Sequence, residues 1–353
     1  MKIQKRALHQ ALTQINKATS PKASLQIIQT VKLTAHNEKL TILGTDLNNY
    51  LRVDLHCTGE DFESCIAARP LLQLVRPEGK TDKGTVTVTM VGNTLAVESD
   101  GIVTWIPTLP ADGFPEPEDD NWRLAAVWPG KEFLNSLQFV SRAASDDCSR
   151  PHICSVYIDN NFLVATNGHQ LHKAPVPTPF LTEVLLSTDT VNLLLNILKL
   201  SDQMFIALSD DQVRIQVGSY TLQAKLKEEQ FPPYEMVIPK RQKSSVTLKT
   251  AGFLRAMKHI AAVSAKAGGM KMTLNGALEL SVDSNLGAAS VDVPLLENGH
   301  HGDVFVAGFN QELITTSLMT DAEQVTLSME SPLDPLVITD NRDRLAVVMP
   351  MRI

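Results

Sequence analysis

The apolar residues of this chain follow a helical period at three places. Leu8, Leu12 and Ile15 lie at positions i, i+4 and i+7, with polar residues between them. Apolar residues with this spacing line one face of an amphipathic helix. The same stripe returns at Phe133, Leu137 and Val140, and again at Phe253, Met257 and Ile260. The pattern therefore predicts three equivalent helices, spaced by about a third of the chain.

Segments of alternating apolar and polar residues follow each predicted helix and reach a short polar turn. Alternation with a period of two is the pattern of a strand, whose successive side chains point to opposite faces. The three turn residues are Asp46, Asn167 and Asp283, which lie 121 and 116 positions apart. This regular spacing indicates an internal repeat of roughly 118 residues.

Each repeat continues with a second helix, predicted at residues 69–76, 188–200 and 310–319. Strand-like segments follow, and Gly92-Asn93 and Gly218-Ser219 supply tight turns in the first two repeats. Strands joined by such short turns pair antiparallel. We therefore predict an α+β protein in which two helices per repeat pack on antiparallel sheets.

Proline-rich segments separate the repeats. Leu109–Pro115 follows the first repeat and Glu229–Tyr234 follows the second. Proline cannot donate to a β-ladder, so these segments are predicted to leave the sheets as linkers. We expect three similar domains, at residues 1–118, 119–240 and 241–353.

The C-terminal segment Val347–Ile353 is apolar and carries a single charge. Chain ends fray unless something holds them, and an apolar end left in water would be unfavourable. We predict that this segment is the last strand of a sheet, next to Thr166–Leu171 and Phe231–Tyr234. From these residues alone, a plain core strand without a binding role is an equally good interpretation.

The formal net charge of −7 argues against a general nucleic-acid-binding protein. Basic residues nevertheless gather in two segments without acids. The first precedes Glu38 and holds Lys2, Lys5, Arg6, Lys17, Lys22 and Lys32. The second lies between Glu235 and Glu279 and holds Lys240, Arg241, Lys243, Lys249, Arg255, Lys258, Lys266 and Lys271. A charge run is usually a solvated face, but like charges repel, so two such segments favour a polyanionic partner.

The sequence predicts a cytoplasmic protein. We expect no signal peptide, because the basic start is not followed by an apolar run, and no apolar stretch is long enough to span a membrane. The four cysteines Cys57, Cys65, Cys148 and Cys154 match no common zinc or redox spacing. We interpret them as reduced, mostly buried thiols, and we expect no metal and no cofactor.

Five motifs along the whole chain resemble one known family, the bacterial DNA sliding clamp, which is the β subunit of DNA polymerase III. These motifs are Gly44–Leu47; Thr108–Pro110 with Phe114-Pro115; Ala165–His169 with Leu171; Phe231-Pro232 with Tyr234 and Val237; and Val347–Arg352. The closing Val-Val-Met-Pro-Met-Arg is the most specific of them, whereas Gly44–Leu47 alone would be weak.

The resemblance implies a head-to-tail homodimer of three-domain subunits that closes a ring around duplex DNA. Helices would line the hole and meet phosphates without sequence specificity. The ring would tether a DNA polymerase catalytic subunit and clamp-loader subunits, which bind through short apolar motifs, and it would have no catalytic activity. The alternative is a clamp-fold paralogue that serves a repair polymerase or acts as a decoy.

The resemblance also implies three sets of functional residues. The partner-peptide groove would comprise Ile153, Thr166, Gly168, His169, Gln170, Leu171, Pro232, Met236, Val237, Val347, Val348, Met349, Pro350, Met351 and Arg352. Contacts with DNA are expected from Lys5, Arg6, Lys17, Lys22, Arg69, Arg76, Arg142, Arg150, Lys199, Arg255, Lys258 and Lys266. The dimer interface is expected at Thr104, Ile106, Ala262 and Val263.

The sequence departs from the family pattern inside the expected groove. Asn167 stands where Asp is usual, and Gln170 and Met236 stand where Arg is usual. The two lost arginines predict a weaker preference for acidic residues flanking a bound peptide. His169 could also suggest an active site, but no nucleophile signature or metal-ligand spacing accompanies it. A role in the groove or its turn is therefore the better interpretation.

Overall fold

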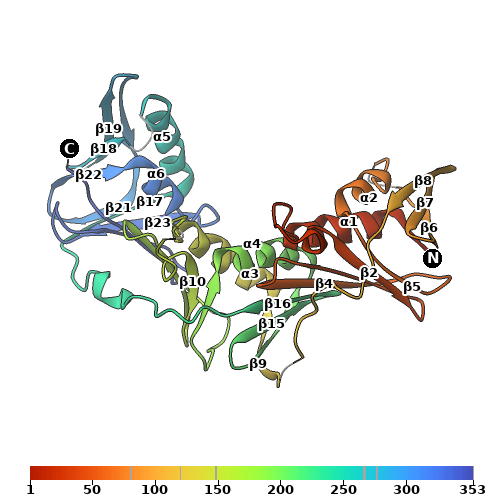
Figure 1. The fold of residues 1–353 in the computed structure, drawn as a ribbon. Coiled ribbons are helices and arrows are strands. Elements are labelled where there is room, and N and C mark those ends of the chain that lie inside the picture. The colour runs from red at the N-terminus through yellow and green to blue at the C-terminus, as the bar shows by residue number, and fades with distance from the viewer. Residues whose placement is uncertain (80–81, 120, 148, 265–267, 276, 353) are drawn as a thin grey trace. The chain divides into compact units, whose positions relative to one another are not determined.

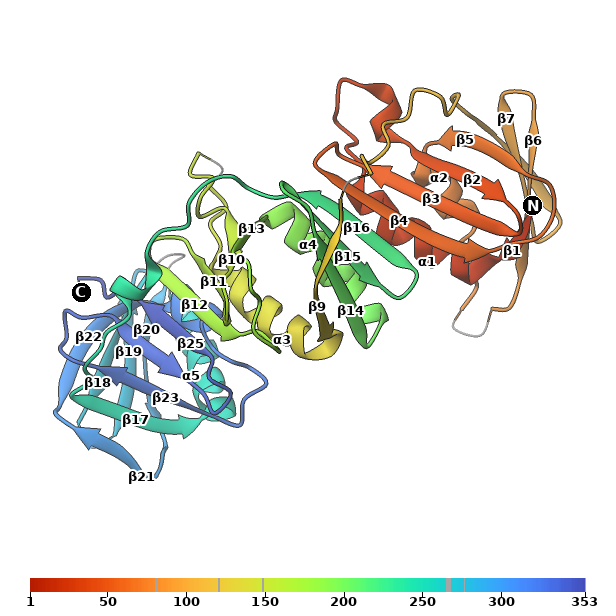
Figure 2. The same ribbon diagram turned by 90° about the horizontal axis from the view of Figure 1, so that it is seen from below.

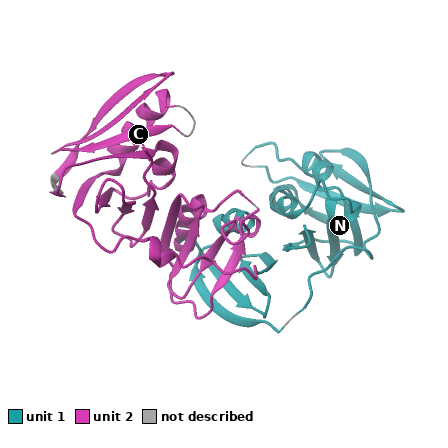
Figure 3. Ribbon diagram, turned by 60° about the vertical axis from the view of Figure 1, so that its left-hand side comes forward, with its two compact units in different colours: residues 1–131, 192–226 teal, residues 132–191, 227–353 magenta. Residues whose placement is uncertain are grey.

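The structure, a computed structural model, describes residues 1–353 except 80–81, 120, 148, 265–267, 276 and 353, and it leaves the side chains of 297–300 undescribed. The chain forms two compact units. Unit 1 comprises Met1–Lys131 and Asn192–Leu226, and unit 2 comprises Glu132–Val191 and Lys227–Ile353 (Figure 3). No helix in the described part of the chain is long and apolar enough to cross a membrane.

Unit 1 contains two antiparallel sheets, with strand orders β1-β6-β7-β8 and β5-β2-β3-β4-β16-β15-β14-β9 (Figure 1). The strands of the first sheet are β1 Lys2–Gln4, β6 Thr85–Val91, β7 Thr94–Ser99 and β8 Ile102–Pro107. Those of the second are β2 Val31–His36, β3 Lys39–Thr45, β4 Asn49–His56, β5 Phe62–Ile66, β9 Arg123–Pro129, β14 Gln203–Leu208, β15 Gln212–Val217 and β16 Tyr220–Lys225.

Unit 2 also contains two antiparallel sheets, with orders β13-β10-β11-β12-β25-β24-β23-β17-β21 and β20-β19-β18-β22 (Figure 2). The larger sheet is built from β10 Ser155–Ile158, β11 Phe162–Thr166, β12 Gln170–Pro175, β13 Val184–Ser187, β17 Ser244–Lys249, β21 Leu295–Gly302, β23 Gln324–Met329, β24 Leu336–Thr339 and β25 Leu345–Val348. The smaller one is built from β18 Gly269–Leu274, β19 Leu278–Ser284, β20 Gly287–Val293 and β22 Phe305–Asn310.

Six α-helices occur in the described residues, two for each predicted repeat. They are α1 Lys5–Ile15, α2 Ala68–Leu74, α3 Gly130–Val140, α4 Thr188–Ile197, α5 Thr250–Val263 and α6 Gln311–Thr316. Short 3-10 turns are η1 Asn16–Ala18, η2 Gln26–Gln29, η3 Ser141–Ala143, η4 Leu198–Leu200 and η5 Tyr234–Val237. All six predicted helices and the α+β class are therefore confirmed.

The apolar stripes of the first helices form the cores of the two units. Leu8, Leu12 and Ile15 are almost completely buried, and α1 packs on β3 and β4. In unit 2, α5 buries the equivalent stripe against β19 and β20. Each fully buried side chain of this size contributes about 1.5–3 kcal/mol relative to an exposed one. These stripes hold the helices on the sheets.

The predicted polar turns at Asp46, after β3, and at Asn167, after β11, have the same structure. The Oδ1 atom of Asp46 accepts hydrogen bonds from the backbone amides of Asn48 and Asn49. In the same way, the Oδ1 atom of Asn167 accepts hydrogen bonds from the backbone amides of His169 and Gln170, at 2.9 and 3.0 Å. An amide oxygen thus replaces a carboxylate oxygen without loss of the turn, so the departure at Asn167 leaves the local fold intact.

The third repeat does not follow this pattern, and the predicted turn at Asp283 is wrong. Strand β19 continues through Asp283 to Ser284. The turn lies one step later, where the Ser284 hydroxyl accepts a hydrogen bond from the amide of Leu286. A hydroxyl on the last strand residue thus takes over the role of the Asx side chain.

The sheets continue across the boundaries between repeats. Strand β4 of the first repeat pairs with β16 of the second, and β12 of the second pairs with β25 of the third. Each large sheet therefore contains strands from two repeats, and the middle repeat contributes to both units. This sharing explains why contacts divide the chain into two units, whereas the division into three domains remains a prediction.

A buried polar network lies on the side of β12 that faces α3 and α6. The Nδ1 atom of His172 is 2.8 Å from the carbonyl oxygen of Phe139, and its Nε2 atom is 2.9 Å from Oγ of Ser317. A carbonyl only accepts, so Nδ1 carries the proton and Nε2 accepts from the serine. The imidazole also stacks on the Phe139 ring, with centroids 4.6 Å apart. Complete burial lowers the pKa of His172 to about 4, and the Arg142 charge adds to this effect.

The buried His172 should make unit 2 less stable in acid. Between pH 6.5 and 4 the unfolded chain binds a proton at this side chain that the folded chain does not, so stability falls as pH falls through this window. The loss amounts to about 3 kcal/mol at most. The unfolding temperature, measured from pH 7.5 to pH 4.5, reports this loss. The variant His172→Gln should have a lower unfolding temperature at pH 7.5, but that temperature should decrease less on acidification.

The exposed His301 of the same unit provides the control, because His301→Gln removes an imidazole without removing buried contacts. Its acid sensitivity should match that of the unmodified chain. An equally steep decline for His172→Gln would show that another group causes the acid sensitivity.

Candidate functional site

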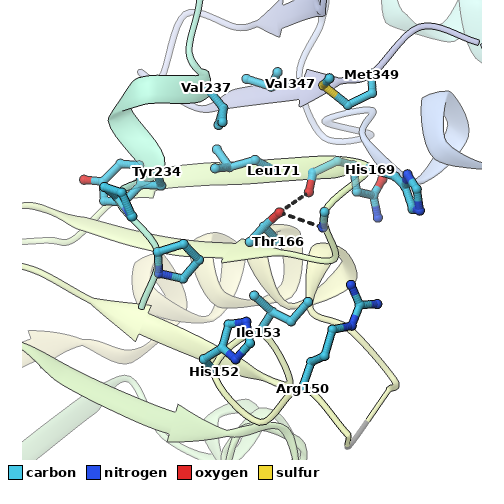
Figure 4. Close-up of a pocket in the computed structure, with 14 residues that line it drawn as sticks. Arg150, His152, Ile153, Thr166, His169, Leu171, Tyr234, Val237, Val347 and Met349 are labelled. Atoms are coloured by element: carbon cyan, nitrogen blue, oxygen red, sulfur yellow. Dashed lines mark hydrogen bonds between the residues drawn. The ribbon is translucent and has the colours of Figure 1, made fainter. Parts of the chain in front are cut away.

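A cavity of about 320 Å³ opens in unit 2, where β11, β12 and the residues after β25 meet the segment around η5 (Figure 4). We call this cavity the tail groove. It is lined by Arg150, His152, Ile153, Thr166, Gly168, His169, Gln170, Leu171, Pro232, Pro233, Tyr234, Val237, Val347 and Met349. The lining is mostly apolar, which is typical of a site for an apolar ligand.

The C-terminal segment forms one wall of the tail groove, as predicted. Gln170 pairs with Val348 and Leu171 with Val347 across the β12–β25 ladder. The amide of Met349 then donates to the carbonyl oxygen of His169 at 2.9 Å. Regular strand structure ends at Val348, and the Met351 amide donates a further hydrogen bond to the Gly308 carbonyl oxygen at 2.8 Å.

The floor of the groove is formed by Leu171, Tyr234 and Val347, which pack with Val164 in a buried apolar cluster. Above it, the side chains of Met349 and Val237 are 43% and 49% exposed. Binding of a ligand that covers large, half-exposed apolar side chains is favourable, because it removes apolar surface from water. Methionine adapts to ligands of different shape because its side chain is unbranched and flexible.

The loop between β11 and β12 is fixed by hydrogen bonds at the edge of the groove. The Thr166 hydroxyl donates to the carbonyl oxygen of Gln170 at 2.7 Å and accepts from the amide of Gly168 at 3.1 Å (Figure 4). Gly168 has φ +89°, in the left-handed region where a side chain is strained. A rigid loop of this kind presents His169, which is exposed, in a fixed position.

Arg150 supplies a positive charge on the groove wall that was not predicted there. Its side chain is 48% exposed and its Nε atom lies 3.0 Å from a carboxylate oxygen of Asp147. Arg150 was expected instead among the residues that contact DNA. His152, Pro233 and Tyr234 also line the groove and were not among the predicted lining residues, although Arg150 and His152 closely precede the predicted Ile153.

Several predicted groove residues do not line the cavity. Met236 is 81% exposed and Val348 is completely buried, and neither lines the cavity. The remaining ones lie beyond the ordered strand: Pro350, Met351 and Arg352. Strand alternation explains Val348, because its neighbours Val347 and Met349 face the groove.

Gln170 contributes to the groove, but its side chain does not lie on the rim. It is 4% exposed, and its Nε2 atom donates to the carbonyl oxygen of Arg142 at 3.1 Å. Its Oε1 atom accepts from the Thr316 hydroxyl at 3.0 Å and lies 3.3 Å from Oγ of Ser317. The expectation that Gln170 removes a charge from the rim is therefore wrong, since the side chain belongs to the buried network around His172.

The predicted DNA-binding residues of unit 1 are exposed with one exception. The exposed ones are Arg6, Lys17, Lys22, Arg69, Arg76 and Lys199. Lys5 is only 2% exposed, and its ammonium group lies 2.5 Å from a carboxylate oxygen of Asp100. Lys5 is therefore excluded from the set, because its charge is already neutralised inside the unit.

In unit 2, α5 carries Arg255 and Lys258 on its exposed side. Arg142 is exposed as well, but its guanidinium also donates to the carbonyl oxygen of Leu318. Lys266 lies outside the described residues. The basic surface predicted on α5 is thus present on the side opposite its buried stripe.

Two of the predicted dimer residues lie on a strand, β8, and the other two lie on a helix, α5. Thr104 and Ile106 are on β8, the edge strand of its sheet, with three exposed apolar neighbours: Ile102, Val103 and Trp105. The Ile106 side chain itself is 6% exposed and packs inside unit 1. Ala262 and Val263 form the last turn of α5, beside edge strand β20.

Among the described residues, no group of three or more His, Cys, Asp or Glu side chains could hold a metal ion. The described cysteines Cys57, Cys65 and Cys154 are buried, and none of the three is in a disulfide with another described residue. Burial raises the pKa of the Cys65 thiol to about 11, so this group is an inert thiol at neutral pH. The apolar tail groove is thus the main candidate site of unit 2.

Known proteins share the sequence pattern along the whole chain. Residues 1–118 match the family described as DNA polymerase III beta subunit, N-terminal domain. The beta sliding clamp of Vibrio cholerae is 26% identical over 369 residues, and the alignment covers 99% of each chain. The beta sliding clamp of Pseudomonas aeruginosa is 25% identical over 368 residues, with the same coverage.

Solved structures share the fold. A sliding clamp from Pseudomonas aeruginosa, bound to griselimycin, has a TM-score of 0.91 at 23% identity and covers 100% of this chain and 99% of its own. The DNA polymerase III beta subunit from Thermotoga maritima has a TM-score of 0.89 at 19% identity, with the same coverage. Residues 1–118 thus match the N-terminal domain of the DNA polymerase III beta subunit, and the chain as a whole is similar in sequence to bacterial beta sliding clamps and shares the fold of their solved structures.

Proposed function

We propose that this chain is a DNA polymerase processivity clamp that holds its partners through the tail groove. A sliding clamp is not an enzyme: it binds DNA and partner proteins without chemistry of its own. The observation that carries the assignment of the groove is the β12–β25 pairing, which places Val347 and Met349 beside Leu171 and Val237. The decoy or repair paralogue is not favoured, because relatives named beta sliding clamp match over nearly their full length.

The proposed partners follow from the two surfaces. Polymerase and clamp-loader subunits would insert short apolar motifs into the tail groove, whose exposed Met349 and Val237 side chains gain by being covered. Duplex DNA would contact the basic residues on α5 and their counterparts in unit 1 through its phosphates. The buried cysteines, which form no disulfide among the described residues, suit a reducing compartment, so the clamp would act in the cytoplasm.

We further propose a head-to-tail homodimer in which β8 of one subunit pairs with the edge formed by β20 and the end of α5 in the other. Both strands are at the edges of their sheets. Ile102, Val103 and Trp105 on β8 expose 69%, 51% and 56% of their surfaces. An exposed apolar edge strand of this kind is normally covered by another chain.

Removal of Met349–Ile353 should abolish binding of an apolar peptide to the tail groove. The peptide would lose its contacts with Met349 and with the segment beyond it, and each lost buried side chain costs about 1.5–3 kcal/mol. Affinity should therefore fall by more than tenfold. Fluorescence anisotropy with a labelled hexapeptide rich in Leu and Phe measures the change.

Two point variants support this experiment. Val237→Asp adds a charge to the groove at a half-exposed position. This variant should also lower the affinity for the peptide by more than tenfold. Leu333→Asp adds the same charge at a position that is 85% exposed and does not line the groove, and it should have no effect. Undiminished binding by both the truncated chain and Val237→Asp would place the groove elsewhere.

Charge reversal on α5 should weaken DNA binding. Arg255→Glu combined with Lys258→Glu removes two proposed phosphate contacts and adds repulsion, so duplex binding should fall by more than tenfold at about 100 mM salt. The slope of log K against log salt should decrease by about 2, since each contact releases counterions. Anisotropy of a labelled duplex at several salt concentrations gives both values.

Lys271→Glu provides the control on the same unit. Lys271 is exposed on β18, whose neighbours Met270 and Met272 are buried, so its side chain points away from the buried side of that sheet. This variant should bind DNA nearly as well as the unmodified chain. Equal losses for the control and for α5 would indicate a general effect of net charge.

Negative charges on β8 should dissociate the dimer. Ile102→Glu with Thr104→Glu places two carboxylates on the edge strand, and the subunit affinity should fall by more than tenfold because buried charges are costly. Sedimentation velocity reports the change. Thr89→Glu is the matched control, since Thr89 is exposed on the interior strand β6 of the same sheet. A dimer that survives the double substitution contradicts the assignment of β8.

A further inference from the structure

A second cavity in unit 2 lies beside the tail groove. It has a volume of about 360 Å³ and shares Pro232, Pro233 and Tyr234 with the groove. These three residues form a wall common to the two cavities. A peptide that leaves the tail groove over the wall would reach the second cavity within a few residues, at about 3.3 Å per extended residue.

Aromatic rings form one wall of this second cavity. The rings of Tyr157 and Phe231 are stacked with centroids 5.0 Å apart and planes 10° apart. Tyr234 meets both of them edge-on. The faces of such rings are electron-rich and attract cations. One cation already uses this property, because Nζ of Lys173 lies 3.6 Å from the centroid of Phe162.

The charged residues of the second cavity are mainly acidic. It is lined by the carboxylates of Asp159, Glu183 and Glu235 and by one ammonium group, that of Lys173. Glu183 and Glu235 are exposed and come from two separate segments, the residues before β13 and the 3-10 turn η5. The tail groove differs, because Arg150 supplies its charge. In Figure 4, Tyr234 and Arg150 lie on opposite sides of Leu171 and Thr166.

Tyr234 connects the two cavities. Its ring belongs to the apolar floor of the tail groove, while its hydroxyl points away from Leu171 and donates to Asp159 in the second cavity (Figure 4). Burial and the neighbouring carboxylate of Asp159 raise the pKa of Tyr234, so the hydroxyl stays protonated and keeps donating. Tyr234 therefore holds the second cavity in a fixed position beside the tail groove.

We propose that the second cavity binds a positively charged side chain, arginine or lysine, of the same peptide that occupies the tail groove. This inference rests on the proposed function of the groove. The aromatic faces suit the flat guanidinium group of arginine in particular, and the two exposed carboxylates are placed to pair with it. The groove and its neighbour would then select an apolar motif with a basic flank on the side of Tyr234.

The experiment compares five labelled peptides that share one apolar core. One peptide is the core alone, two carry Gly-Gly-Arg at one end or the other, and two carry Gly-Gly-Ala at one end or the other. We expect the arginine extension at one end to tighten binding by about fivefold to tenfold at low salt, and the alanine extension to change little. The gain should shrink at high salt because the carboxylates are partly exposed.

Glu183→Gln combined with Glu235→Gln should remove this gain and leave the affinity for the core alone unchanged. Asp292→Asn combined with Glu323→Gln is the matched control, because these exposed carboxylates of unit 2 line neither cavity. The control should keep the gain, which separates the local site from an effect of net charge.

Each outcome decides between the two proposals. If the core peptide binds but arginine brings no gain at either end, this inference is wrong and the proposed function stands. A gain that persists in the Glu183→Gln and Glu235→Gln variant also contradicts the inference, since the cation then binds elsewhere. Failure of the core peptide itself to bind would overturn the assignment of the tail groove and this inference with it.

Discussion

The pairing of β12 with β25 is the interaction on which the rest of unit 2 depends. It joins residues 170–173 to residues 345–348 by an antiparallel ladder and so connects two parts of a nine-stranded sheet. Without this ladder, Val347 and Met349 would have no fixed position beside Leu171. The groove is therefore a consequence of sheet formation and needs no separate element to build it.

One strand serves both the groove and the interior because side chains alternate along it. Leu171 faces the tail groove, whereas its neighbours Gln170 and His172 face the buried network with Ser317. Hydrogen bonds on one face hold the strand while apolar contacts on the other face remain available to a ligand. A rigid, already formed site of this kind loses little conformational entropy on binding.

Much of the fold could be predicted from the sequence because it repeats. The apolar stripes of the helices and the pairing of the tail follow from periodicity and burial, which a sequence shows directly. The direction of single polar side chains does not. Lys5 was predicted to be an exposed charge, but in the structure it is buried and pairs with Asp100, which is distant in sequence. Gln170 was expected on the groove rim but is buried, and Arg150 was expected to contact DNA but lines the groove. The reason is the same in both cases: tertiary neighbours decide where a polar side chain points.

The shared sheets have a consequence for cutting the chain. Because β4 pairs with β16 and β12 with β25, a fragment that ends between sequence repeats keeps its helices but loses the neighbour of one strand. That strand would then offer a full row of free amide and carbonyl groups to any other chain. The repeats are separable as sequence but not as hydrogen-bonded structure, and an isolated repeat of this chain would be prone to aggregate along its exposed edge.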